Sequence, residues 1–201
     1  TNGETITSNY AEYNKKLNLI TLKKNVSLVD NKNNRISTEL AIYNEKLKTF
    51  ETKGSTQIIT TENYKIKSEN IILEINKKNL SSNNKTIITD NDFNKIVLEN
   101  FKYNTNSNIF KSIGLIEIKD KLNNEYKFSQ IYIDTKKKEI LGTDIKAYLN
   151  HKDFKINKNN KPRVFSNTIK LSREKSQFNK SVFTLCNYRK KDKCPPWTLQ
   201  A

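Results

Sequence analysis

The chain is poor in the residues that build helices. Among its 201 residues, methionine is absent and alanine occurs 4 times, whereas asparagine occurs 30 times and isoleucine 23 times. Asparagine disfavours helix interiors, and β-branched isoleucine favours pleated strands. The composition therefore argues against a helix-rich architecture and favours an all-β fold.

Further absences narrow the class of protein. No stretch approaches the roughly 18 apolar residues of a membrane-spanning helix, and Thr1 opens a polar segment instead of a signal peptide. Cys186 and Cys194 are the two cysteines, too few to indicate a disulfide scaffold or a four-ligand zinc site. We expect no metal and no cofactor. Because the chain lacks an initiating methionine, we also expect a processed piece of a longer product.

The positive charge consists mainly of lysine. The net charge is +16, from 37 lysine and arginine residues against 21 acidic ones, and a basic surface suggests a nucleic-acid partner. However, arginine, which makes bidentate contacts with phosphates and bases, occurs 4 times. Lysine, asparagine and isoleucine, whose codons are rich in A and T, supply 86 residues. A nucleic-acid-binding module is therefore a minor alternative, and we expect no nucleic acid.

A 30-residue repeat organises residues 1–150. Apolar residues recur in register in five columns, a regularity that predicts a repeat architecture. The columns are Ile6, Ile36, Ile66, Ile96 and Tyr126; Ala11, Ala41, Ile71, Phe101 and Ile131; Tyr13, Tyr43, Leu73, Tyr103 and Ile133; Ile20, Phe50, Leu80, Phe110 and Ile140; and Leu28, Ile58, Ile88, Ile118 and Tyr148.

Within each unit the apolar residues follow strand spacing. Ile20 and Leu22 alternate with polar residues, as do Val26 and Leu28, so one face of the strand is buried. The two-residue alternation of apolar and polar positions is interrupted between residues 8 and 11, which predicts a bulge or corner there. Each unit therefore contains two strands of about ten to twelve residues, and such thin units must stack to bury their apolar faces. The stacked strands either close on a core, as in a structural β-solenoid, or fold over to leave an apolar groove.

Residues 151–201 form a second region, where the regular pattern fades. Residues 157–162 read as a loop, and residues 163–165, 168–171 and 181–186 predict three short strands. The end contains the run Val182-Phe183-Thr184-Leu185-Cys186, a basic loop, and the run Cys194-Pro195-Pro196-Trp197.

These two runs resemble the junction between the periplasmic domain and the outer-membrane barrel in the LptD family of lipopolysaccharide-assembly proteins. The preceding Lys161, Pro162 and Arg163 are similar to the approach to that junction. The repeat columns resemble the OstA-type domain of the LptA, LptC and LptD families. The resemblance is tight over residues 162–201 and loose over the repeats.

The resemblance implies a twisted, folded-over β-jellyroll, or β-taco, whose apolar interior holds the acyl chains of lipopolysaccharide. It thus favours the groove over the closed core. The residues expected to line the groove are Ile6, Ala11, Tyr13, Ile20, Leu22, Val26, Leu28, Ile36, Ala41, Tyr43, Phe50, Ile58, Ile66, Ile71, Leu73, Leu80, Ile88, Ile96, Phe101, Tyr103, Phe110, Ile116 and Ile118.

The resemblance also implies a location and partners. It places the chain in the periplasm as part of an outer-membrane protein, and Pro195, Pro196 and Trp197 at the junction with that protein's own barrel. The implied partners are lipopolysaccharide, an LptA-type bridge protein bound by edge-strand pairing, and an LptE-type lipoprotein. Cys186 matches a family cysteine that bonds to the barrel. Cys194 departs from the family pattern, so a local bridge between Cys186 and Cys194 and two separate thiols both remain open.

The sequence carries no pattern typical of an enzyme. Its carboxylates are scattered through turns, Asp90 and Asp92 fit an asparagine-rich turn, and His151 lies in a polar segment. We therefore expect no catalysis. Residues 151–201 carry 13 basic and 3 acidic side chains, against 24 and 18 in residues 1–150. This basic end is expected to attract phosphates and acidic sugars of the lipid, or an anionic membrane surface.

Overall fold

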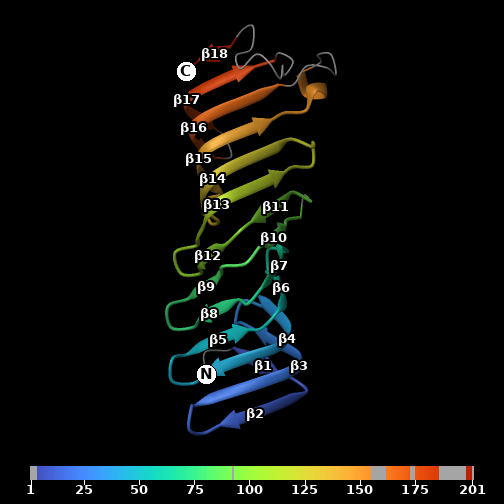
Figure 1. The fold of residues 1–201 in the computed structure, drawn as a ribbon, viewed down its shortest axis with the longest axis vertical. Coiled ribbons are helices and arrows are strands. Elements are labelled where there is room, and N and C mark those ends of the chain that lie inside the picture. Colours follow the sequence, from blue (N-terminus) through green and yellow to red (C-terminus); the bar gives the residue numbers. More distant parts are fainter. Residues whose placement is uncertain (1–3, 92, 155–161, 173–174, 186–197, 201) are drawn as a thin grey trace.

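Antiparallel strands stack into a long column in the protein (Figure 1). A computed structural model describes residues 4–91, 93–154, 162–172, 175–185 and 198–200. Within these residues the strands form an 18-stranded sheet, and the one helix is the short 3-10 helix η1 (His151–Phe154). The prediction of an all-β, folded-over stack is confirmed.

The strands keep the order of the chain along the column. Their bounds are β1 (Thr5–Thr7), β2 (Tyr10–Asn14), β3 (Leu19–Val29), β4 (Arg35–Asn44), β5 (Thr49–Thr52), β6 (Ser55–Ile59), β7 (Lys65–Glu69), β8 (Ile72–Glu74), β9 (Asn79–Ser82), β10 (Thr86–Thr89), β11 (Lys95–Leu98), β12 (Phe101–Asn104), β13 (Ile109–Lys119), β14 (Glu125–Asp134), β15 (Glu139–Tyr148), β16 (Arg163–Leu171), β17 (Ser176–Thr184) and β18 (Leu199–Gln200). Residues 163–165 and 168–171, predicted as separate strands, thus belong to the single strand β16.

Each 30-residue unit bends in the middle, at a corner that separates two arms. In β3 the pairing register shifts between Lys23 and Val26, and β13 shifts at the equivalent position, between Ile113 and Ile116. The first arm ends at turns 15–18, 45–48, 75–78, 105–108 and 135–138. The second arm ends at the turns that begin at residues 30, 60, 90 and 120.

The middle of the column is divided at this corner. Strand β4 pairs with both β5 and β6, after which two separate ladders run side by side. The ladder β5–β8–β9–β12 belongs to the first arm, and β6–β7–β10–β11 belongs to the second. Both ladders join again on the long strand β13. The middle units therefore contain half-length strands where strands of ten or more residues were expected.

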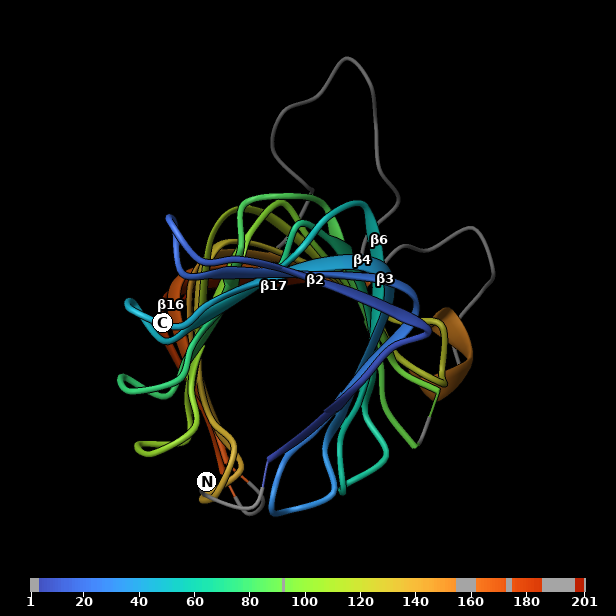
Figure 2. The same ribbon diagram turned by 90° about the horizontal axis from the view of Figure 1, so that it is seen from below.

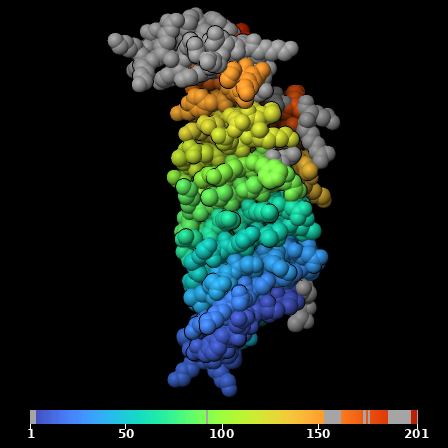
Figure 3. Space-filling model, turned by 90° about the vertical axis from the view of Figure 1, so that its right-hand side faces the viewer, coloured from blue at the N-terminus to red at the C-terminus, as the bar shows by residue number. Residues whose placement is uncertain are grey.

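The column twists along its length. Seen from one end, successive turns of each arm are displaced around the axis (Figure 2). This displacement is the expected result of the right-handed twist of stacked strands. The surface view shows the units as successive bands from residue 4 upward (Figure 3). Each unit is therefore rotated relative to the unit below it.

The turns explain the high asparagine content. Asn18, Lys48, Lys78, Asn108 and Lys138 share one register position on the first arm and have positive φ angles between 53° and 59°. On the second arm, Asn33, Asn63, Phe93 and Asn123 share another such position, with φ between 62° and 65°. Asparagine tolerates this left-handed conformation better than other side chains with a Cβ atom. Asparagine thus suits five of these nine positions, whereas Lys48, Lys78, Lys138 and Phe93 occupy the other four.

A side-chain ladder joins neighbouring turns of the second arm. Asn124 donates from Nδ2 to Oδ2 of Asp120 at 2.8 Å, and its Oδ1 accepts the backbone N–H of Asn150 in the next turn at 2.7 Å. Asn34 and Asn94 make equivalent bonds to the aspartates of their own turns. These bonds hold successive units at a constant spacing.

Candidate functional site

The inner face is closely covered at the corner. The inward side chains on both sides of the bend are buried in every unit, from Val26 and Ala41 through Ile71 and Leu98 to Ile145. These buried side chains lie on, or directly beside, strands that have a paired neighbour on both sides. The corner is therefore a continuous hydrophobic floor along the described column.

Hydroxyl groups complete the floor in the divided middle units. Thr56 donates to Oγ1 of Thr52 at 2.7 Å, and the same Thr52 oxygen accepts the backbone N–H of Ile71 at 2.8 Å. Ser68 and Thr86 form an equivalent pair at 2.7 Å. Within the described residues, every buried side-chain nitrogen or oxygen has a hydrogen-bond partner. The corner is thus sealed without an unpaired polar group, which would cost about 1–3 kcal/mol.

Near the turns the inner face is less well covered. At these positions some apolar side chains are buried, such as Phe50 and Ile58, while others pack against the core and stay partly exposed. We call the partly exposed set the mouth. It consists of Ile6, Ile20, Tyr43, Ile66, Leu73, Ile96, Tyr103, Ile118, Tyr126, Ile133, Ile140 and Leu171.

The structure places the predicted groove residues in three groups. The buried ones are Leu22, Val26, Leu28, Ile36, Ala41, Phe50, Ile58, Ile71, Leu80, Ile88, Phe101, Phe110 and Ile116. The partly buried ones are Ile6, Ile20, Tyr43, Ile66, Leu73, Ile96, Tyr103 and Ile118. Ala11 and Tyr13 are exposed.

The exposure of Ala11 and Tyr13 corrects the expectation that they lie inside. Both occupy inner-face register positions, opposite Leu22 and Ile20. Among the described strands, however, β2 has a neighbour on one side only, β3, so no further unit covers them. The Tyr13 hydroxyl donates to Glu45 at 2.9 Å, and this bond to the carboxylate raises the pKa of the phenol.

Part of the same surface lies outside the predicted set of groove residues. Leu98, Phe128, Ile145 and Ile169 are buried in the core, and four residues from Tyr126 to Leu171 belong to the mouth. Tyr126, Ile133 and Ile140 already lay in the repeat columns, so extending those columns past residue 120 would have found them. Phe101 and Phe110, from neighbouring strands, stack with ring centres 5.8 Å apart.

Several predicted features lie outside this surface. Cys186, Cys194, Pro195, Pro196 and Trp197 lie outside the described residues. His151 begins helix η1, and Asp90 bonds Asn94 within its own turn. In the described part of the chain, no three His, Cys, Asp or Glu residues are grouped to hold a metal ion. No helix there is long and apolar enough to cross a bilayer.

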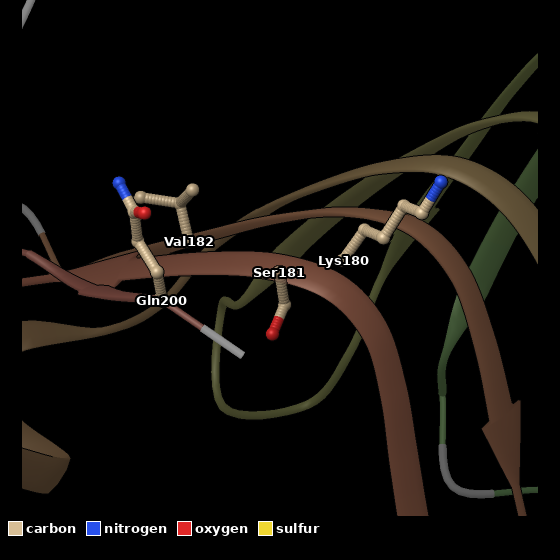
Figure 4. A pocket seen from close by; sticks show the side chains of 4 residues that line it. All are labelled: Lys180, Ser181, Val182 and Gln200. Atoms are coloured by element: carbon tan, nitrogen blue, oxygen red, sulfur yellow. The ribbon is translucent and has the colours of Figure 1, made fainter.

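Shallow hollows among the described residues lie apart from the residues of the mouth. The hollow at the β17–β18 end has a volume of about 450 Å³ and is lined by Lys180, Ser181, Val182 and Gln200 (Figure 4). Ser181 points to the opposite side of the strand from Lys180 and Val182, so the hollow follows the edge of the sheet. The second, of about 270 Å³, lies over β9, β12 and β13.

Comparison with solved structures finds matching chains, LptH among them. The chain is similar to LptH, the LptA homologous periplasmic component of the lipopolysaccharide transport device from Pseudomonas aeruginosa. The match covers 68% of this chain and 79% of that chain, with 12% sequence identity and a TM-score of 0.28. A likeness at this level establishes neither a shared fold nor a shared activity. No protein-family model matches the chain, and no curated protein matches it.

Proposed function

We propose that the protein is a periplasmic lipid-transport domain whose inner face carries the acyl chains of lipopolysaccharide. The observation that carries this proposal is the mouth, a line of partly exposed isoleucine, leucine and tyrosine side chains beside a sealed apolar floor. The resemblance of the carboxy-terminal segment to the LptD junction supports the choice of lipid and compartment.

The geometry suits transfer without covalent chemistry. Buried apolar area contributes roughly 25 cal/mol per Å², and this stabilisation is kept while a chain slides along a uniform apolar surface. The mouth is mostly aliphatic and continues from Ile6 to Leu171 through the stacked units. Sugars and phosphates would stay in water outside the arms. This role requires no catalytic group.

The partners follow from the two ends of the column. We propose that the β1–β2 edge receives lipid from an LptA-type bridge protein by strand pairing, because exposed edge strands add further strands readily. At the other end, the chain would pass lipid to an outer-membrane barrel held with an LptE-type lipoprotein. The basic residues of region 151–201 would hold the lipid phosphates there.

Site-specific photocrosslinking tests the proposal. A crosslinker at Tyr43 or Tyr103, in the mouth, should capture lipopolysaccharide, whereas one at the outward-facing Glu12 or Thr21 should not. Tyr43→Asp should abolish capture at Tyr103, because an ion in the apolar path costs several kcal/mol. Tyr132→Asp, on the outer face, is the matched control. Equal capture from both faces, or none from the mouth, would instead favour the closed-core structural module.

A further inference from the structure

The outer face carries a feature that lipid transport along the inner face does not use. Ser81, Lys102 and Lys111 form one cross-strand row over β9, β12 and β13, and Lys102 lies directly opposite Lys111. Their neighbours along the strands, such as Phe101 and Phe110, are buried on the inner face, so both lysines project outward. The row lines the hollow of about 270 Å³.

The juxtaposed lysines carry an unbalanced charge. Directly opposed side chains of a strand pair have Cβ atoms about 4.5–5.5 Å apart, and like charges at these positions destabilise the pair. Two other lysine pairs face each other across the described strands, Lys95 with Lys119 and Lys127 with Lys146. In each of those pairs, one lysine binds a glutamate on the adjacent strand.

Lys102 and Lys111 have no such partner. Within the described residues, neither ammonium forms an ion pair, and their register neighbours are Ser81 on one side and Tyr132 on the other. The nearby Glu74 is already bound by Lys77 at 2.6 Å and by Asn79. Lys102 interacts electrostatically with Glu74, which helps to lower the pKa of that carboxyl, but the two lysines face each other without an ion pair of their own.

The hollow is lined by polar and apolar residues together, the apolar ones being Phe101 and Ile113. The hollow is also lined by Ser81, Asn83 and Asn100. The Asn100 amide is held by the backbone of Ile113, donating to its carbonyl at 2.6 Å and accepting its N–H at 3.3 Å. Ser112 also lines the hollow, and its hydroxyl donates to the Asn100 carbonyl at 2.6 Å, so Ser81 and Asn83 are the further neutral residues of the lining that carry hydrogen-bond donors.

We propose that this hollow binds a phosphate group. A doubly charged phosphate neutralises both ammonium groups at once, and charge-assisted hydrogen bonds to its oxygens are about twice as strong as neutral ones. Lysine is a compact point charge suited to such a ligand. The hollow of about 270 Å³ has room for a phosphate group together with water. The phosphate is either a free ion or part of a lipid headgroup, and the site is independent of the proposed acyl path.

The test is a phosphate titration of the full chain followed by backbone amide NMR. Inorganic phosphate should produce saturable shifts confined to Ser81, Lys102, Lys111 and their neighbours. The variant Lys102→Gln with Lys111→Gln should bind at least tenfold more weakly, because both positive charges that the phosphate would contact are removed. The matched control, Lys15→Gln with Lys46→Gln, removes the same charge from exposed turns and should bind as the unmodified chain does.

A second experiment distinguishes a free phosphate ion from a lipid headgroup. Flotation with phosphatidylcholine vesicles, with and without phosphatidic acid, measures binding to a lipid headgroup. Site-dependent binding to either probe supports the proposal and identifies the source. Equal weakening in the variant and its control, shifts spread over many lysine-bearing strands, or no binding to either probe would overturn it. Crosslinking of lipopolysaccharide at Tyr103 should be unchanged in the double variant. The experiments can therefore contradict the phosphate site without contradicting the proposed lipid transport, and the reverse.

Discussion

The corner and the mouth are built from the same repeat but differ in how completely they are covered. At the corner, each inner side chain is enclosed by both arms and by the neighbouring units, so Ile116 and Ile131 are fully buried. At the mouth, the arms diverge, and Ile118 and Ile133 are partly exposed two residues farther along the same strands. Stability thus concentrates at the bend, while the apolar face that can receive a ligand lies near the turns.

The largest expected effect is a difference in unfolding free energy between a corner residue and a mouth residue of the same strand, β13. Ile116→Ala should lower the free energy of unfolding by about 3 kcal/mol, because it leaves a cavity in a sealed part of the core. Ile118→Ala removes the same atoms where solvent already has access, so its cost should be about half as large or less. Urea unfolding of both variants measures the difference. Equal losses would mean that the mouth is as enclosed as the corner.

The next effect probes the hydroxyl groups that seal the divided units. Thr52→Val keeps the side-chain shape but removes the acceptor for the Ile71 N–H and the Thr56 hydroxyl. The loss should be about 2 kcal/mol, the typical cost of a buried unpaired group. Thr21→Val, on the outer face of β3, is the control and should change stability by less than about 0.5 kcal/mol. If Thr52→Val left the free energy of unfolding unchanged, water would have to reach the corner of the divided middle units.

The smallest effect concerns a mouth-side turn. Phe93 is 84% exposed and has a φ of 62° at a position where three other units have asparagine. Phe93→Asn should raise the free energy of unfolding by about 0.5–1 kcal/mol, because asparagine adopts this conformation at lower cost. Asn123→Phe, the reverse change in the next turn, should lower it. A destabilised Phe93→Asn variant would indicate that the ring makes a stabilising contact.

Much of the fold was predictable because the repeat is local and regular. Alternation of Ile20 and Leu22 with polar residues marks the inner face of each strand. The columns recur every 30 residues, so a position predicted to face inward in one unit predicts the equivalent inward positions in the other units. The interrupted alternation between residues 8 and 11 also predicted the position of the corner, which lies between β1 and β2.

The errors arose where position in the stack, and not local pattern, decides burial. Tyr13 and Tyr43 share a column, but Tyr13 lies on the end strand and is exposed, whereas Tyr43 packs against the core. The division of the middle strands at Thr52 and Ser55 likewise depends on the pairing of both neighbours. The phosphate site is equally hidden from sequence, because Lys102 and Lys111 are nine positions apart and meet only across β12 and β13.

The sequence alone determined the repeat, the strand faces and the asparagine-rich turns, since these depend on side-chain chemistry at fixed spacing. The tertiary structure decided which apolar residues are enclosed and which remain open to a ligand. The physical reason is that burial depends on coverage by neighbouring units and by the opposite arm. Identical columns of isoleucine can therefore serve as a sealed floor at the corner and as a partly exposed mouth near the turns.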